Sequence, residues 1–171
     1  METLIGENKV QELKQKSNAV KELNPKIHFI GHLQSNKIKE VLKWTSCIES
    51  IDRLSVAQKL QQRLILEAKE IVIYRQENTS LEESEFGVSP DQTIELVKKI
   101  ATFKNIHIKG LMTIDLLSSE STEIRKCFQL LKQLQEEIKI LILSNVEMNE
   151  LSMGMSGDLE IVIEEGLQLY V

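Results

Sequence analysis

The sequence is short of the residues and runs that mark several protein classes. Two cysteines in 171 residues, Cys47 and Cys127, are too few and too far apart to predict a disulfide framework or a zinc site. No apolar run approaches the roughly 20 residues of a membrane span, and the first residues, METLIGENK, lack the features of a secretion signal. A net charge of -5 leaves no cationic excess for a nucleic-acid groove. These absences predict a cytoplasmic protein that binds neither membranes nor nucleic acids.

The composition of the chain predicts one globular domain. With 42% hydrophobic and 27% charged residues, the chain can bury a substantial core. No linker or low-complexity segment divides it, so residues 1–171 are expected to form a single domain. No Ser/His/Asp or Cys/His arrangement of a hydrolase is recognisable, and His32 and His107 are interpreted as structural or exposed.

Two periodicities alternate along the chain. Short apolar runs predict strands, and runs with apolar residues three and four apart predict helices. The expected strands are residues 3–5, 27–30, 47–51, 71–74, 106–114, 149–152 and 168–171, and the expected helices fall within 10–23, 52–68, 89–103 and 121–138. Ser89, Pro90 and Gln92 have the spacing of an N-cap, a first helical proline and a capping-box partner. Strands that alternate with helices favour a parallel sheet, because parallel neighbours need a helical crossover.

Two architectures fit six strand–helix units followed by a seventh strand. One is an incomplete (β/α)8 TIM barrel, and the other is a doubly wound open sheet. Both bind ligands at the carboxyl ends of the strands, so the segments that follow the strands are the places to inspect. They are rich in Gly, Ser, Asn and Thr, which suits anion binding by backbone amides at helix N-termini.

Six segments in the same order carry a resemblance to a known family. They are GENKVQE, HFIGHLQSNK, SIDRL, NTSLEESEFGVSP, IKGLMTI and LSMGMSGDLEIVIEEG. Together they resemble the pyridoxal phosphate homeostasis protein family, whose barrel is similar to the N-terminal domain of alanine racemase. The resemblance implies a barrel that binds pyridoxal 5'-phosphate (PLP) and takes part in vitamin B6 homeostasis without catalysing a reaction.

The resemblance also implies which residues contact the cofactor. The turn from Ser152 to Ser156 would receive the phosphate, with a close backbone approach at Gly154 and hydroxyl donors at both serines. Met153 and Met155 would offer adaptable apolar contact to the ring. The full set of expected binding residues is Asn8, His28, Met112, Ser152, Met153, Gly154, Met155 and Ser156.

Two parts of the family pattern are not found in the sequence. The cofactor-linking lysine of the family lies in a Val-Ser-Lys type segment before GEN, which here begins at Gly6, and an Arg-x-Gly-Thr segment follows the family's eighth strand. Their absence predicts weakened or lost cofactor binding and an open seam whose edges could form a homodimer. As substitute lysines, Lys9 and Lys37 lie at the ligand end but in solvated segments, whereas Lys109 is expected to lie away from it.

Two other functions compete with cofactor homeostasis. A racemase or decarboxylase relative would need the Schiff-base lysine and a second acid or base, and no motif supports Tyr74 or Tyr170 in that role. An interaction protein could use the open strand edges without any ligand. Just after the expected fourth strand, Arg75 and Glu77 share a parity and should face one side together, where their burial would be costly unless they pair with each other or lie near solvent.

Overall fold

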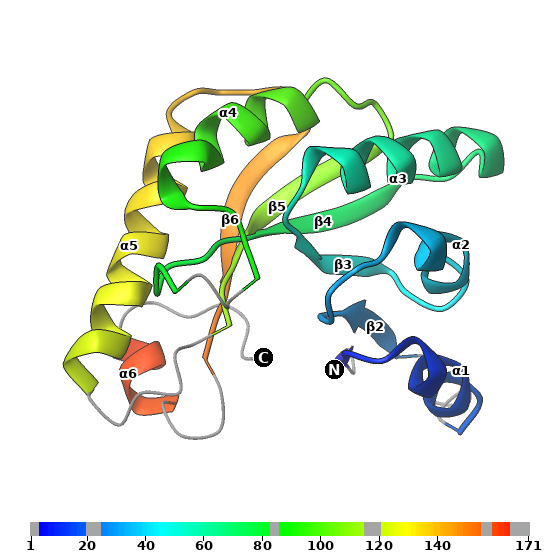
Figure 1. Ribbon diagram of the computed structural model, residues 1–171, viewed down its shortest axis with the longest axis horizontal. Coiled ribbons are helices and arrows are strands. Elements are labelled where there is room, and N and C mark those ends of the chain that lie inside the picture. The colour runs from blue at the N-terminus through cyan, green and yellow to red at the C-terminus, as the bar shows by residue number, and fades with distance from the viewer. Residues whose placement is uncertain (1–3, 20–24, 83–85, 115–120, 155–158, 165–171) are drawn as a thin grey trace.

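Six parallel strands and the helices between them make up the fold (Figure 1). The structure is a computed structural model, and it describes residues 4–19, 25–82, 86–114, 121–154 and 159–164. The strands are β1 (Leu4–Glu7), β2 (Lys26–Phe29), β3 (Cys47–Ile51), β4 (Ile71–Gln76), β5 (Ile106–Met112) and β6 (Val146–Ser152). The helices are α1 (Val10–Ala19), α2 (Ile38–Val41), α3 (Leu54–Glu67), α4 (Pro90–Ile100), α5 (Ser121–Lys139) and α6 (Leu159–Glu164), with a 3-10 turn, η2 (Ser35–Lys37), before α2.

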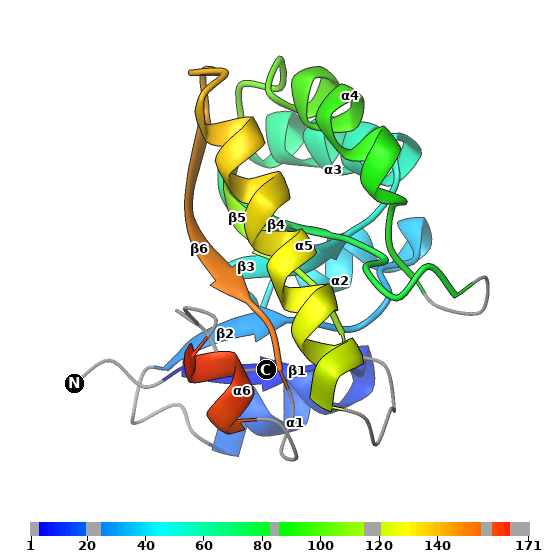
Figure 2. The same ribbon diagram turned by 90° about the vertical axis from the view of Figure 1, so that its left-hand side faces the viewer.

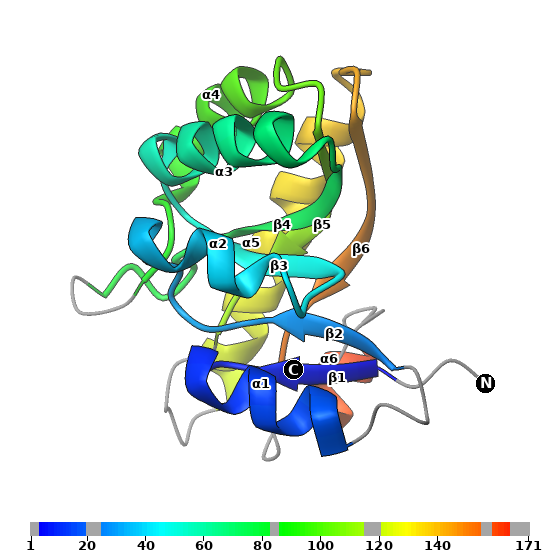
Figure 3. The ribbon, with the colours of Figure 1, turned by 90° about the vertical axis from the view of Figure 1, so that its right-hand side faces the viewer.

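The strand order decides between the two predicted architectures. The sheet runs β1-β2-β3-β4-β5-β6, and each strand is parallel to its neighbours. A doubly wound sheet reverses its strand order at a switch point, and this order never reverses. The sheet curves, and helices α1 to α5 lie along one side of it (Figures 2 and 3). The fold is therefore the expected incomplete (β/α)8 barrel; the seventh predicted strand, residues 168–171, lies outside the described residues.

The two faces of the sheet have different compositions. Toward the helices, aliphatic side chains such as Ile48, Ile73 and Leu111 belong to one large core. On the opposite face, which we call the inner face, a small cluster of Cys47, Tyr74 and Met112 packs against Ile30 and Val72. Alternation of side chains along each strand separates the two sets.

A β-bulge changes this alternation in β5. The pairing register between β5 and β6 shifts between Ile108 and Gly110. A side chain at Gly110 would place its Cβ 1.8 Å from the backbone oxygen of Glu150, so only glycine permits this close approach. As a result, Lys109 and Met112 both contribute to the inner face although they are three positions apart.

The start of α4 agrees only in part with the capping prediction. Pro90 occupies the first turn and Ser89 has the extended backbone of an N-cap, as expected. However, the Ser89 side chain makes no capping hydrogen bond. The Gln92 amide donates instead to the Ser89 carbonyl at 3.0 Å, so the predicted capping box is wrong.

Arg75 and Glu77 are paired and buried, as their shared parity predicted. Both side chains are 0% exposed, and Arg75 Nη2 lies 3.7 Å from Glu77 Oε1. Arg75 also donates to the Ile51 carbonyl, and Glu77 accepts the Thr93 hydroxyl.

Among the described helices, none is long and apolar enough to cross a membrane.

Candidate functional site

Three polar side chains meet on the inner face near the carboxyl ends of their strands. His28 of β2 contacts Glu49 of β3 through Nδ1 and Oε1. The other carboxylate oxygen of Glu49 accepts the hydroxyl of Ser152, which ends β6. The curvature of the sheet therefore brings together residues more than 100 positions apart in the sequence.

A second polar group links β4, β5 and β6. The Tyr74 hydroxyl donates to Glu150, and Lys109 Nζ lies 2.6 Å from the other oxygen of the same carboxylate. Burial and the hydrogen bond to Glu150 raise the pKa of Tyr74 far above its usual value. Although burial alone would raise the pKa of Glu150, its contacts with Lys109 and Tyr74 lower it overall. The hydrogen bond to Glu150 also raises the pKa of Lys109, so the amine stays protonated.

Cys47 lies beside the first of these groups. Its register partner on the neighbouring strand is His28, and Glu49 follows two positions later on the same face. Burial and the nearby charge of Glu49 raise the pKa of the Cys47 thiol well above its usual value. The thiol is thus protonated and unreactive in the metal-free protein.

The predicted binding residues are only partly brought together. His28, Met112 and Ser152 share the inner face, whereas Asn8 is exposed just beyond β1. Met153 packs in the helix-side core. Gly154 is buried with a φ of 93°, a conformation that favours glycine and turns the chain after β6. Met155 and Ser156 lie outside the described residues.

The lysines considered as substitutes are held by other groups or exposed. Lys9 is exposed and pairs with Glu12, as its solvated interpretation expected. Lys37 lies in the 3-10 turn after β2 and is half-buried. Lys109 points to the inner face, because it alternates with the core residues Ile106 and Ile108, and its Nζ lies 2.6 Å from Glu150.

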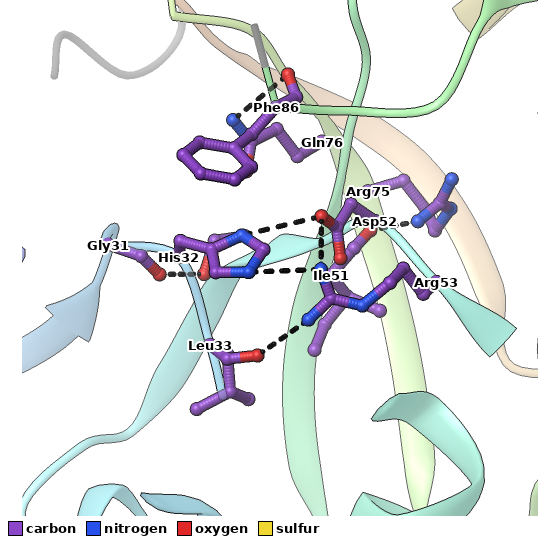
Figure 4. A network of polar contacts seen from close by, with 10 residues as sticks. Gly31, His32, Leu33, Ile51, Asp52, Arg53, Arg75, Gln76 and Phe86 are labelled. Carbon is purple, nitrogen blue, oxygen red and sulfur yellow. Dashed lines mark hydrogen bonds and ion pairs between the residues drawn. The ribbon is translucent and has the colours of Figure 1, made fainter. Parts of the chain in front are cut away.

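A third network surrounds His32 after β2 (Figure 4). The ring stacks on Phe86 with centroids 4.0 Å apart, and its Nε2 lies 3.0 Å from Arg53 Nη1. Arg53 also donates to Asp52 and to the Leu33 carbonyl. These contacts tie the loops after β2 and β3 together, which agrees with the structural interpretation of His32. His107 is also as expected, because it is partly exposed and bonded to Glu70.

A groove of about 470 Å³ lies outside the inner face, between α4 and the start of α3. Its walls carry charges of both signs together with apolar side chains. It is lined by Asp52, Arg53, Leu54, Val88, Asp91, Gln92, Glu95, Leu96 and Lys99. None of these lining residues belongs to the polar groups around Glu49 and Glu150, so the groove is a distinct candidate site.

Sequence reasoning missed the two carboxylates of the inner face. Glu49 has a detectable signal, since it shares the parity of Cys47 while Ile48 belongs to the helix side. Lys109 has the same signal, because it alternates with the buried residues Ile106 and Ile108, whereas Glu150 lies opposite the bulge in β5, where the register shifts.

The sequence and the fold have close counterparts among known proteins. The family described as alanine racemase, N-terminal domain, matches residues 3–169. A pyridoxal phosphate homeostasis protein of Aquifex aeolicus is 37% identical over 163 residues, which cover 95% of this chain and 71% of that protein. One from Helicobacter pylori is 37% identical over 167 residues, or 96% of this chain and 72% of its own. The chain belongs to the pyridoxal phosphate homeostasis protein family.

Several solved structures have the same fold. PipY of Synechococcus elongatus, in a structure with PLP bound, matches with a TM-score of 0.87 and 26% identity over 96% of this chain and 76% of its own. A protein of unknown function from Bifidobacterium adolescentis matches with a TM-score of 0.92 and 33% identity, over 98% and 72%. An alanine racemase of Clostridium difficile, at 12% identity and a TM-score of 0.76, shares the fold.

Proposed function

We propose that the chain binds PLP at the carboxyl ends of its strands and serves cofactor homeostasis in the cytoplasm. The observation that carries this proposal is the likeness to PipY with PLP bound, which extends over 96% of the chain. In our proposal the phosphate lies at the turn that Ser152 and Gly154 begin, with the ring beside His28 and Met112. Asn8, Met155 and Ser156 stay proposed contacts, and of Met153 only the backbone remains one.

The inner face supports a binding role rather than catalysis. A PLP-dependent racemase needs a neutral lysine for the Schiff base and a second acid or base. Lys109 is protonated in its ion pair with Glu150, and the Tyr74 hydroxyl donates to the same carboxylate while its pKa is raised. Both groups are therefore poorly suited to exchange protons with a substrate. We propose that the chain is not an enzyme.

Replacing Ser152 with alanine tests the phosphate position. The change removes a hydroxyl that could donate to the phosphate, and a hydrogen bond to a charged group contributes about 1.5–3 kcal/mol. We expect PLP to bind about tenfold or more weakly, while pyridoxal, which has no phosphate, binds equally to both proteins. Titrations followed by absorbance measure both ligands, and Ser121→Ala, an exposed change in α5, is the control.

An unchanged PLP affinity in Ser152→Ala, or an equal loss for pyridoxal, would remove the phosphate from this turn. Failure of the unsubstituted protein to bind PLP at all would refute the proposed function. Weaker PLP binding than in the relatives stays a prediction, and the same titration, carried out on a relative as well, measures it.

We also propose a homodimer through the edges of the sheet. In the described part of the chain, β1 pairs only with β2 and β6 only with β5. Strand edges with unpaired backbone groups favour association with another chain. Light scattering of the purified protein is expected to give twice the mass of the chain, and a monomeric mass at all concentrations would contradict this.

A further inference from the structure

His28, Cys47 and Glu49 form a cluster of potential metal ligands, of which the cofactor proposal uses only His28. One ligand atom from each, an imidazole nitrogen, a thiol sulfur and a carboxylate oxygen, lies within 4.8 Å of the other two. Cys47 and Glu49 are buried, and His28 is nearly so. We propose that this cluster binds a divalent transition metal ion of the zinc type on the inner face.

The backbone fixes the three side chains in this arrangement. His28 and Cys47 are register partners on adjacent parallel strands, so their side chains leave the sheet side by side. Cys47 and Glu49 are two positions apart in β3 and point to the same face. No loop has to close to assemble the donors, and sites on strands hold their geometry better than sites on loops.

The donor set favours zinc over harder cations. Zinc accepts thiolate, imidazole and carboxylate ligands, whereas magnesium and calcium prefer oxygen ligands alone. Bond lengths of about 2.0–2.3 Å place tetrahedral zinc ligands about 3.3–3.8 Å apart. Small rotations of the side chains would bring the ligand atoms to these separations, and the hydrogen-bonded atoms of His28 and Glu49 would move apart as the metal takes the place between them. Three protein ligands leave a fourth position for water or for the nearby Ser152 hydroxyl.

The charge balance of the inner face provides a second argument. Glu150 has Lys109 as a permanent cation, but Glu49 has no lysine or arginine in ion-pair contact among the described residues. Its partners there are the imidazole of His28 and the hydroxyl of Ser152, neither of which is a permanent cation. A buried carboxylate is costly unless a cation or several hydrogen bonds compensate it. A bound metal ion would supply that charge, and the Cys47 proton would pass to solvent as the sulfur binds the metal.

Cobalt(II) is the probe, because it takes zinc sites and reports its ligands by absorbance. The chelator-treated protein, without PLP, is expected to bind one Co²⁺ per chain with a thiolate-to-cobalt charge-transfer band in the near ultraviolet, and Zn²⁺ should displace it. Cys47→Ser should abolish the band. His28→Asn and Glu49→Gln should each weaken Co²⁺ binding by about tenfold or more. Removing a residue that only hydrogen-bonds to a metal ligand already costs about tenfold in affinity, and losing a ligand itself should cost at least as much.

Cys127→Ser is the matched control. Its thiol is also buried, but it lies on α5 and donates to the Thr79 carbonyl, away from the inner face. The band should be unchanged in this variant. A band that survives in Cys47→Ser, a band lost equally in Cys127→Ser, or a folded wild-type protein without any band would overturn the proposal. If Cys47→Ser does not fold, normal affinity in His28→Asn would overturn it. Because PLP is absent, these results leave the proposed function untouched.

Discussion

Glu77→Ala is expected to lower the free energy of unfolding by about 3–5 kcal/mol, because it leaves a guanidinium buried without its partner. Arg75 is fully buried, and burial lowers its pKa while the charges of Glu77 and Asp52 act to raise it. Burial also raises the pKa of Glu77, despite the opposing charge of Arg75 and the hydrogen bond from Thr93. The two groups therefore tolerate their surroundings only as a pair.

Urea unfolding followed by circular dichroism measures this loss. Glu95→Ala is the control, because Glu95 forms an exposed ion pair with Lys99 on α4 and such pairs contribute little. The double variant Arg75→Met/Glu77→Leu removes both charges and should be clearly more stable than Glu77→Ala. A Glu77→Ala loss no larger than that of Glu95→Ala would show that the pair does not stabilise the barrel.

Glu49→Gln is expected to strengthen PLP binding by about tenfold when a chelator keeps the protein free of metal. The carboxylate of Glu49 contacts the Ser152 hydroxyl, so it lies next to the proposed phosphate position. Two unit charges about 5 Å apart repel each other by about 3 kcal/mol at an effective dielectric constant of 20, and solvent and salt around the phosphate screen this to about 1.4 kcal/mol, or roughly tenfold in affinity. The neutral amide removes this repulsion and keeps a hydrogen-bonding group in place.

Pyridoxal separates this charge effect from a change of shape. The gain in Glu49→Gln should apply to PLP and not to pyridoxal, and added salt should reduce it. Glu147→Gln, an exposed change on β6, is the control and should leave both affinities unchanged. Weaker PLP binding in Glu49→Gln would place the phosphate away from Ser152, or show that the carboxylate holds the cofactor.

Much of the fold could be predicted from the sequence because its cause is local. The spacing of apolar residues distinguishes strands from amphipathic helices, and this spacing correctly predicted all six described strands. β6 begins at Val146, earlier than predicted, because polar residues interrupt its apolar pattern. The order of the strands, which distinguishes a barrel from an open sheet, needed either the structure or the resemblance to a family.

The site was harder to predict because it depends on parity and register. Ser152 and Met153 were both expected to contact the cofactor, but adjacent residues in an extended segment point to opposite faces. Met153 accordingly packs against the helices. Alternation could have corrected this. No pattern in the sequence could have joined Tyr74 to Glu150, which lies 76 positions away and opposite a bulge.

A crystal structure of the protein with PLP tests the central claim most directly. The account predicts the phosphate at the turn begun by Ser152 and Gly154, and the ring on the inner face beside His28 and Met112. Cofactor bound instead in the groove between α3 and α4, lined by Arg53 and Lys99, would contradict it.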